Sequence, residues 1–352
     1  MEIDLNKDKK LSVLFEYGQS GLVNLGNTCY LNTAIQCLSS IKYLTVYFLS
    51  NKYGDDLNLN KKENEFVEEY SELLKDIWRK NHKIVPASFK KDIGKFYEPY
   101  SGVRQQDSIE AYCKILELLH EGLSYGATMI LPREAESYSD RINTLAFNVW
   151  QNYYQTNYSV ILKIFYGQFW TRRKCIFCKK NNYSFDPFNV INLPIKENTN
   201  TLFQCIDDLV SSEDMGKDEM YCENCKKNVF GVRKTSVWRM PPVITFCFNR
   251  YDIRGNKIDK FIDFPVRKCS FSNLAEKKID KSATYELYAI ANHSGSMGGG
   301  HYWAYTKGTN GRWYEYDDDT VSEVDISTLV SSRAYYLVYV RGGIRLNELI
   351  FS

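Results

Sequence analysis

Residues 24–32 of this 352-residue chain read Asn24-Leu25-Gly26-Asn27-Thr28-Cys29-Tyr30-Leu31-Asn32, a polar turn that leads into a helical pattern. Apolar residues continue the helical spacing beyond Cys29, namely Leu31, Ala34, Ile35 and Leu38. We therefore expect a helix that begins at or near Cys29. Unpaired backbone N–H groups and the positive end of the helix dipole favour a thiolate there. A thiolate is a nucleophile, so this placement prepares Cys29 for attack on a carbonyl group.

The asparagines that flank the turn strengthen this prediction. The side-chain amides of Asn24 and Asn27 could donate hydrogen bonds to an oxyanion that develops next to Cys29. For a single cysteine the commoner role is that of a small buried hydrophobe. A second segment, close to the other end of the chain, favours the nucleophile.

That second segment carries the residues that a nucleophilic cysteine needs. It reads Asn292-His293-Ser294-Gly295-Ser296-Met297-Gly298-Gly299-Gly300-His301-Tyr302-Trp303. Its glycines predict a flexible loop, and His301 begins the next predicted strand. Another short strand ends at Asp317, so a hairpin would bring His301 and Asp317 together. A cysteine protease uses such an imidazole to take the thiol proton and a carboxylate to orient the ring.

Each of these features has a simpler explanation when it is taken alone. A histidine at a strand edge commonly has its hydrogen bonds satisfied there. The run of Asp317, Asp318 and Asp319 has the composition of a solvated turn. The presence of cysteine, histidine and aspartate segments in one chain favours a catalytic Cys29 over these explanations.

Two Cys-x-x-Cys pairs predict a metal site, with Cys175 and Cys178 in the first and Cys222 and Cys225 in the second. Four thiolates suit tetrahedral zinc, and each pair lies in a turn that can aim both sulfurs at one point. The 43 residues between the pairs exceed the usual zinc-finger spacing, so we expect the pairs at the tips of neighbouring hairpins. A redox pair and a zinc ribbon that binds nucleic acid are the alternatives. The two copies favour one structural zinc ion, and the nearly neutral chain disfavours nucleic acid.

Composition and charge exclude several classes of protein. Hydrophobic residues make up 44% of the chain and charged residues 25%, as in soluble globular proteins. The 45 Lys and Arg residues against 43 Asp and Glu residues give a net charge of +2, which supports neither nucleic-acid nor membrane-surface binding. No apolar run reaches membrane-spanning length, and no signal peptide is visible. We therefore expect the ten cysteines in a reducing compartment, the cytoplasm or the nucleus.

The chain divides into a helix-rich first part and a strand-rich second part. Helical periodicity predicts helices over Glu63–Lys80 and Ser108–Leu119, the latter ending before Gly122. Residues 124–160 have no clear pattern. Beyond them, β-branched and aromatic runs predict strands at Ser159–Phe165, Val190–Leu193, Val243–Phe248, Tyr285–Ala291, Tyr302–Thr306 and Tyr335–Val340. This order predicts an α+β fold that forms one catalytic domain.

The residues before the second of these helices have two interpretations. Asp107, with Glu110 three residues later, has the form of a capping box. An acidic group at a helix entry could also bind the backbone or the arginine side chains of an extended peptide. The spacing alone favours the cap.

Together these segments resemble the ubiquitin-specific proteases, a family of papain-like cysteine deubiquitinases. The resemblance runs from Gly21 to about Gly342, with shorter matches at Phe165-Tyr166-Gly167, Phe185-Asp186-Pro187-Phe188, Asn249-Arg250-Tyr251 and Phe264-Pro265. It implies a helical thumb at about 19–160, zinc-stabilised fingers at about 161–250 and an antiparallel-sheet palm mainly at 251–342. Residues 1–18 would form an N-terminal extension and residues 343–352 a short C-terminal tail.

The resemblance also implies catalytic roles for individual residues. Cys29 would be the nucleophile, His301 the general base and Asp317 the residue that orients the imidazole. Asn24 corresponds to the oxyanion donor of the family. Asp318 would lie close by and could assist at the oxyanion site.

The substrate that the resemblance implies is ubiquitin. Asp107, next to Gln106, would hold its extended C-terminal tail, and His293 with the loop through Gly300 would border the tail channel. Zinc on the four cysteines would stabilise the fingers, which grip the body of ubiquitin. The implied activity is hydrolysis of isopeptide, peptide or ester bonds at the C-terminal glycine through an acyl-enzyme, by a monomer acting on ubiquitinated proteins. A non-catalytic ubiquitin-binding scaffold and a hydrolase for another ubiquitin-like modifier are the alternatives.

Overall fold

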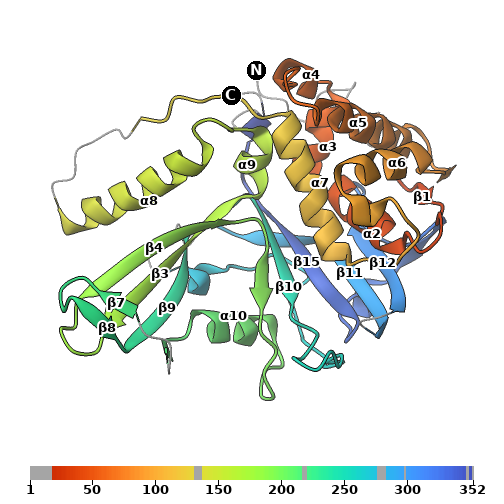
Figure 1. Ribbon diagram of the computed structural model, residues 1–352. Helices are drawn as coiled ribbons and strands as arrows, with labels where there is room; N and C mark the ends of the chain where they lie inside the picture. Colours follow the sequence, from red (N-terminus) through yellow and green to blue (C-terminus); the bar gives the residue numbers. More distant parts are fainter. Residues whose placement is uncertain are drawn as a thin grey trace.

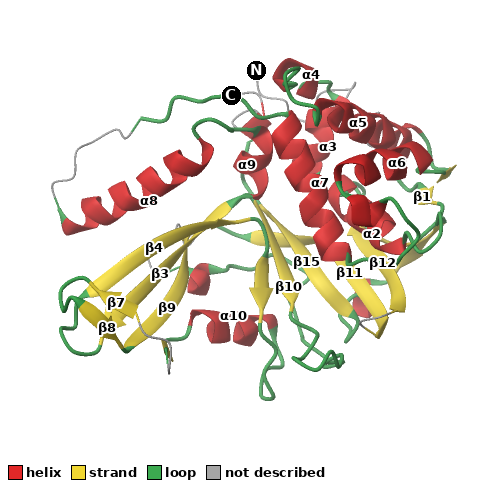
Figure 2. Ribbon diagram, in the orientation of Figure 1, coloured by secondary structure: helices red, strands yellow, loops and turns green. Residues whose placement is uncertain are grey.

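The computed structural model describes residues 18–130, 137–215, 220–275, 283–296, 299–345 and 349–350. A lobe of helices stands against a central β-sheet, and a second sheet extends away from the central one (Figure 1). Figure 2 shows the helices of this lobe gathered on one side of the strands. None of the helices in the described ranges is both long and apolar enough to span a membrane.

The helical lobe is built around α2 (Cys29–Ser39), whose residues are all buried. A helix that has no solvent-exposed face lies in the middle of a core. The amphipathic helix α7 (Ser108–Gly122) packs beside it, and a second amphipathic helix, α5 (Asn64–Arg79), packs on α7. The lobe is completed by α3 (Lys42–Leu49), α4 (Tyr53–Asp56), α6 (Ala87–Phe96), the 3-10 turn η1 (Glu98–Tyr100) and the parallel pair β1 (Gly21–Leu22) and β2 (Lys83–Ile84). The two predicted helices are confirmed, although α7 continues through Gly122.

The central sheet has seven strands in the order β14-β13-β12-β11-β15-β10-β5. Their bounds are β5 (Ile191–Leu193), β10 (Val243–Phe248), β11 (Tyr285–Ser296), β12 (Gly299–Lys307), β13 (Trp313–Asp317), β14 (Thr320–Val324) and β15 (Ala334–Arg341). Neighbouring strands are antiparallel except for β10 and β5. The buried helix α2 packs on β12 and β11, so the residue that begins α2 lies close to the strand that carries His301.

The second sheet has the order β4-β3-β9-β6; the first cysteine pair lies where β3 turns into β4, and the second pair lies on a separate two-stranded hairpin. It consists of β3 (Gly167–Cys175), β4 (Asn181–Phe188), β6 (Glu213–Asp214) and β9 (Gly231–Arg239), with a small hairpin of β7 (Met220–Cys222) and β8 (Lys227–Val229) next to it. Helix α8 (Tyr138–Tyr154) packs on β4, whereas α10 (Leu202–Val210) contacts both β9 and β5 and so joins the two sheets. The remaining 3-10 turns are η2 (Ser272–Leu274) and η3 (Ile326–Thr328).

One predicted strand is wrong, because Ser159–Phe165 forms helix α9 (Val160–Phe165). The Ser159 hydroxyl caps this helix by accepting a hydrogen bond from the backbone N–H of Leu162 at 3.4 Å. All of its apolar side chains are buried, so the run has no exposed face whose spacing could distinguish a helix from a strand. Residues 124–160, which have no clear sequence pattern, contribute α8.

The two faces of the central sheet are covered by two apolar clusters. One joins the helical lobe to the sheet, and the other lies on the opposite face with α10. Leu349 and Ile350, from the segment predicted as a C-terminal tail, are buried in the first cluster. The predicted α+β fold class is confirmed.

Candidate active site

The turn before Cys29 is shaped by the side chain of Asn24. Asn24 Oδ1 accepts hydrogen bonds from the backbone N–H groups of Gly26 and Thr28, each at 3.0 Å. Gly26 (φ 100°) and Asn27 (φ 57°) both adopt the left-handed backbone conformation, which glycine and asparagine tolerate best. The chain then enters α2 with Cys29 as its first residue, as the sequence predicts.

The Cys29 thiol does not have the lowered pKa that a helix N-terminus alone would give it. Burial raises its pKa above the ordinary thiol value, and this effect outweighs a hydrogen bond from the backbone N–H of Tyr302. The negative charge of Asp318 raises the pKa of Cys29 further. The helix N-terminus alone therefore does not favour the expected thiolate, so a nucleophilic role for Cys29 would require a base.

That base is available on the β12–β13 hairpin, where His301 and Asp317 meet. The strands pair antiparallel, and His301 Nε2 lies 2.5 Å from Asp317 Oδ1. Because the carboxylate engages Nε2, the other ring nitrogen, Nδ1, is the one left to exchange a proton. Tyr302, the next residue along β12, contacts the Cys29 thiol through its backbone. The predicted histidine and aspartate are thus brought together beside the cysteine.

Asp318 connects this hairpin to the turn before Cys29. Its Oδ1 accepts a hydrogen bond from Asn32 Nδ2 at 2.8 Å, and its Oδ2 accepts one from Asn24 Nδ2 at 2.9 Å. The Asp318 carbonyl accepts a third bond from the backbone N–H of Leu22 at 2.8 Å. Asp318 is also in the left-handed conformation (φ 51°), so its backbone turns sharply at this point. It ties β13, β1 and α2 together.

Asn32 is a site residue that the sequence interpretation missed. Its amide donates to Asp318 and, at 3.0 Å, to the carbonyl of Leu22. The available signal was its position three residues after Cys29, which places it about one helical turn further along α2.

The two asparagines predicted as oxyanion donors have different partners. Asn24 donates to Asp318, next to the proposed base, whereas the Asn27 amide donates to the carbonyl of Val103 at 2.9 Å. Asn27 therefore fastens the turn to the segment before α7. Of the two, only Asn24 is bonded to the hairpin that carries the histidine.

Asp107 is the N-cap of α7, as its spacing predicts. Its Oδ1 accepts hydrogen bonds from the backbone N–H groups of Ile109 (2.8 Å) and Glu110 (3.2 Å). Its Oδ2 accepts a bond from the Tyr335 hydroxyl at 2.6 Å, which links α7 to β15. The Glu110 carboxylate accepts a bond from the Tyr97 hydroxyl at 2.7 Å. The Asp107 carboxylate thus caps α7 and is held beside β15.

Two adjacent glutamines precede this cap, and they point to different partners. Gln106 Nε2 donates to the carbonyl of Pro99 at 3.0 Å, within the helical lobe. Gln105 Oε1 accepts from Gly300 N–H at 2.7 Å, and its Nε2 donates to the Gly300 carbonyl at 3.0 Å. Gln105, which was not expected in the site, therefore holds the backbone immediately before His301. No sequence signal separates the two adjacent glutamines, because the path of the backbone decides which of the two side chains faces β12.

His293 lies in a strand, so the predicted flexible loop from Asn292 to Gly300 is wrong for the residues that the structure describes there. β11 extends to Ser296 and pairs with β12 as far as Gly299. The His293 side chain is buried, and its pKa is lowered to about 4 by burial and by the charge of Lys257. A neutral, buried His293 is part of the palm beside the active site.

The four cysteines of the two pairs come together at the end of the second sheet. Their Sγ atoms all lie within 4.8 Å of one another, with 3.5 Å between Cys178 and Cys222 and 4.0 Å between Cys175 and Cys225. In both pairs the following lysine is left-handed and donates its backbone N–H to the carbonyl of the first cysteine. The two turns thus have the same shape and aim four sulfurs at one point, where a metal ion could be held.

Comparison with known proteins identifies the family. The family model for ubiquitin carboxyl-terminal hydrolases matches residues 20–339. The chain belongs to this family. It is 31% identical to ubiquitin carboxyl-terminal hydrolase 2 of Bos taurus over 339 residues, which cover 92% of this chain and 55% of that protein. It is 29% identical to ubiquitin carboxyl-terminal hydrolase 21 of Homo sapiens over 358 residues, or 93% and 62% of the two chains. The chain spans about half the length of the curated relatives that it matches first.

The fold is also found in solved structures. A chain of the SAGA Ubp8/Sgf11/Sus1/Sgf73 DUB module bound to ubiquitin aldehyde superposes with a TM-score of 0.73 at 21% identity, covering 94% of this chain and 71% of that one. A yeast SAGA DUBm structure gives 0.72 at 22% identity, with 94% and 70% coverage. The predicted papain-like fold is confirmed: the helical lobe is the thumb, the central sheet the palm and the second sheet the fingers.

The neutral His293 of this ubiquitin carboxyl-terminal hydrolase domain should make its stability depend on pH. Its folded pKa of about 4 lies below the ordinary value of 6.5, so the unfolded chain binds the proton more tightly. Stability is therefore full above pH 6.5 and is lost as the pH falls toward 4, by up to about 3 kcal/mol at roughly 1.36 kcal/mol per pKa unit. Urea unfolding of wild type and His293→Gln across this range measures the effect. Equal losses in the two proteins would contradict it.

Proposed function

We propose that this protein is a cysteine-type deubiquitinating peptidase, which hydrolyses isopeptide, peptide or ester bonds at the C-terminal glycine of ubiquitin. The observation that carries the proposal is the 2.5 Å contact of His301 with Asp317, on a strand whose next residue contacts the Cys29 thiol. Membership in the ubiquitin carboxyl-terminal hydrolase family supports the substrate, as does the fold shared with a module bound to ubiquitin aldehyde.

In this proposal, the first chemical step moves a proton from Cys29 to His301. Because burial raises the pKa of the thiol, the proton has to pass to a base, and Nδ1 of the imidazole accepts it. The sulfur then bonds to the carbonyl carbon of the ubiquitin C-terminal glycine. The imidazolium, held by the Asp317 carboxylate, returns the proton to the leaving amine or alcohol and leaves a thioester. Water, activated by His301, hydrolyses the thioester and releases the ubiquitin carboxylate.

Asn24 is the proposed oxyanion donor. A primary amide has two N–H groups, and the bond to Asp318 uses one of them. The second N–H can donate to the tetrahedral oxyanion without breaking that bond. In this role Asp318 is a positioning residue, because its carboxylate orients the amide.

The proposed site for the ubiquitin tail lies at the entry of α7. Each oxygen of Asp107 already accepts bonds from within the protein, but a carboxylate has about four acceptor positions. Three of these positions are occupied, so Asp107 can cap α7 and also accept one N–H group of an extended tail. Gln106, beside it, and His293, in the neighbouring palm, would border the same tail.

We further propose that the four fingertip cysteines hold one structural zinc ion. Tetrahedral zinc with bonds of about 2.3 Å to sulfur requires sulfur separations of about 3.8 Å. The observed separations of 3.5 and 4.0 Å fit this requirement. The ion would cross-link the β3–β4 turn to the β7–β8 hairpin and take no part in the chemistry.

The catalytic proposal is tested by release of a fluorophore from the C-terminus of ubiquitin. We expect Cys29→Ala to abolish turnover and Asp317→Asn to lower kcat by about 10²- to 10⁴-fold, because the imidazole loses its orienting carboxylate. Equal activity of wild type and Cys29→Ala would refute the nucleophile. Parallel substrates built on other ubiquitin-like modifiers test the substrate class. Tight ubiquitin binding without turnover by the wild type would instead indicate a scaffold.

The zinc proposal is tested with Cys222→Ser and with Cys269→Ser as a matched control outside the cluster. We expect the wild type and the control to contain one zinc ion per chain, and Cys222→Ser to lose the metal and to unfold at a lower temperature. Elemental analysis and thermal unfolding provide the two readouts. Unchanged metal content and an unchanged midpoint in Cys222→Ser would contradict the site.

A further inference from the structure

A short segment of the palm, residues 250–260, folds back on itself directly after β10. Tyr251 and Lys257 form an isolated antiparallel bridge. Asp252 Oδ1 accepts a hydrogen bond from the backbone N–H of Asn256 at 2.8 Å, and its Oδ2 accepts one from the Asn256 amide at 3.0 Å. These bonds hold the 250–260 segment in a defined conformation.

Arg250 fastens this segment to the central sheet. Its side chain is buried, and it donates to the carbonyls of Ala334 (2.6 Å), Ile258 (2.9 Å) and Lys260 (2.8 Å). Ile258 N–H donates back to the Arg250 carbonyl at 2.8 Å. Burying a cation is costly unless its hydrogen bonds are replaced; here three backbone carbonyls accept from Nε and Nη1, whereas Nη2 is buried without a partner among the described residues. Because Ala334 begins β15, the segment is anchored next to β11.

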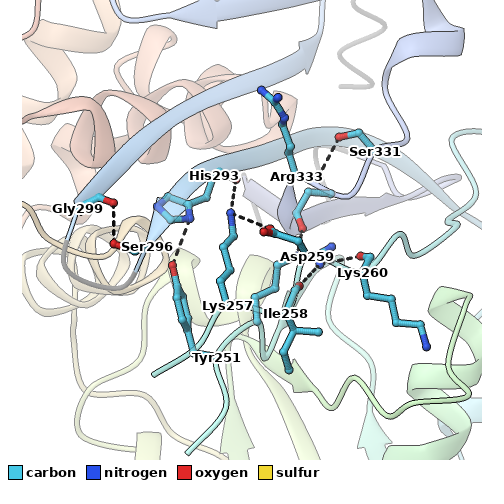
Figure 3. Close-up of polar contacts among 12 residues, drawn as sticks. Tyr251, Lys257, Ile258, Asp259, Lys260, His293, Ser296, Gly299, Ser331 and Arg333 are labelled. Carbon is cyan, nitrogen blue, oxygen red and sulfur yellow. Dashed lines mark hydrogen bonds and ion pairs between the residues drawn. The ribbon is translucent and has the colours of Figure 1, made fainter. Parts of the chain in front are cut away.

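The 250–260 segment contacts His293 at two points. The side chain of Lys257 is only 8% exposed, and its Nζ donates to the His293 carbonyl at 2.8 Å while lying 3.3 Å from the Asp259 carboxylate. The Tyr251 hydroxyl is 3.2 Å from His293 Nδ1. Figure 3 shows Lys257 extending to the backbone of His293 and Tyr251 reaching its ring. The segment thus holds both the main chain and the side chain of this residue.

His293 in turn contacts both neighbours of His301. The Tyr302 ring lies 4.4 Å from its imidazole, centroid to centroid. A Cβ added to Gly300 would come within 2.3 Å of His293 Nε2, so the Gly300 backbone lies directly against the ring. The register between β11 and β15 shifts between Ala291 and Asn292, just before His293, and such an irregularity locally disrupts the ladder.

We propose that Lys257 is a positioning residue for His301: by holding the His293 carbonyl, it fixes the β11–β12 hairpin and thereby the His301 imidazole. The proposal rests on the function proposed above. Within the described residues, the Lys257 ammonium contacts the His293 carbonyl and the Asp259 carboxylate and not the side chains proposed to react. Its effect passes through His293 to Gly300 and Tyr302, which flank His301.

The test compares Lys257→Met with Lys307→Met. Both lysines lie on the palm and pair with a carboxylate. Lys307, however, is at the end of β12 that is distant from His301, and it pairs with Glu286. Because small displacements of a catalytic group cost large factors in rate, we expect Lys257→Met to lower kcat on the ubiquitin fluorophore substrate about tenfold, with KM changed less than about twofold. Lys307→Met should change neither constant.

A second readout does not depend on activity. The chain has four histidines, so an NMR spectrum of labelled imidazole groups contains four signals, and His301→Gln assigns one of them. We expect Lys257→Met to shift the His301 signal and its pH midpoint, and Lys307→Met to leave both in place. A folded Lys257→Met with unchanged kcat and an unchanged His301 signal would overturn the proposal.

Two other outcomes remain informative. If the wild type does not turn over ubiquitin, the proposed function fails, whereas the NMR comparison still tests the positioning. If Lys257→Met does not fold, Lys257→Gln, which also removes the ammonium that donates to the His293 carbonyl but keeps a polar side chain, takes its place in both measurements. An unmoved His301 signal in a folded Lys257→Gln would then overturn the proposal.

Discussion

The carboxylate of Asp318 makes the contact on which the active site depends. It accepts hydrogen bonds from the side-chain amides of Asn24 and Asn32, which are 294 and 286 residues away along the chain. Asn24 shapes the turn before Cys29, and Asn32 lies in the helix that Cys29 begins. The neighbouring Asp317 holds the proposed base. The turn that contains Asp317 and Asp318 therefore helps to position both Cys29, in the thumb, and His301, in the palm.

The electrostatics of the site are consistent with the proposed transfer of a proton from Cys29 to a histidine. Burial and the charge of Asp318 both raise the pKa of Cys29, so the dipole of α2 does not by itself ionise the thiol. His293, which lies close to the proposed base, stays neutral because burial and Lys257 lower its pKa. His301, paired with Asp317, is thus the proposed acceptor of the Cys29 proton, and in the proposed mechanism its placement governs the rate.

Much of this arrangement follows from local sequence, and the exceptions have physical reasons. Cys29, His301 and the four metal-site cysteines were predicted because each has a local signature of spacing. The α9 helix was mistaken for a strand because a short, wholly buried apolar run has no periodic signal. Gln105 was missed because its partner, Gly300, is 195 residues away. Contacts between distant segments decide such positions, and no pattern within either segment encodes them.

The central claim is that Cys29, His301 and Asp317 form one site for the carboxyl terminus of ubiquitin. Its most direct test is incubation of the protein with ubiquitin that carries an electrophile at its C-terminus, followed by intact mass measurement and peptide mapping. We predict one covalent adduct per chain, on Cys29, that forms slowly in Asp317→Asn and is absent in Cys29→Ala. A folded wild type that stays unmodified, or an adduct that maps to another cysteine, would contradict the claim.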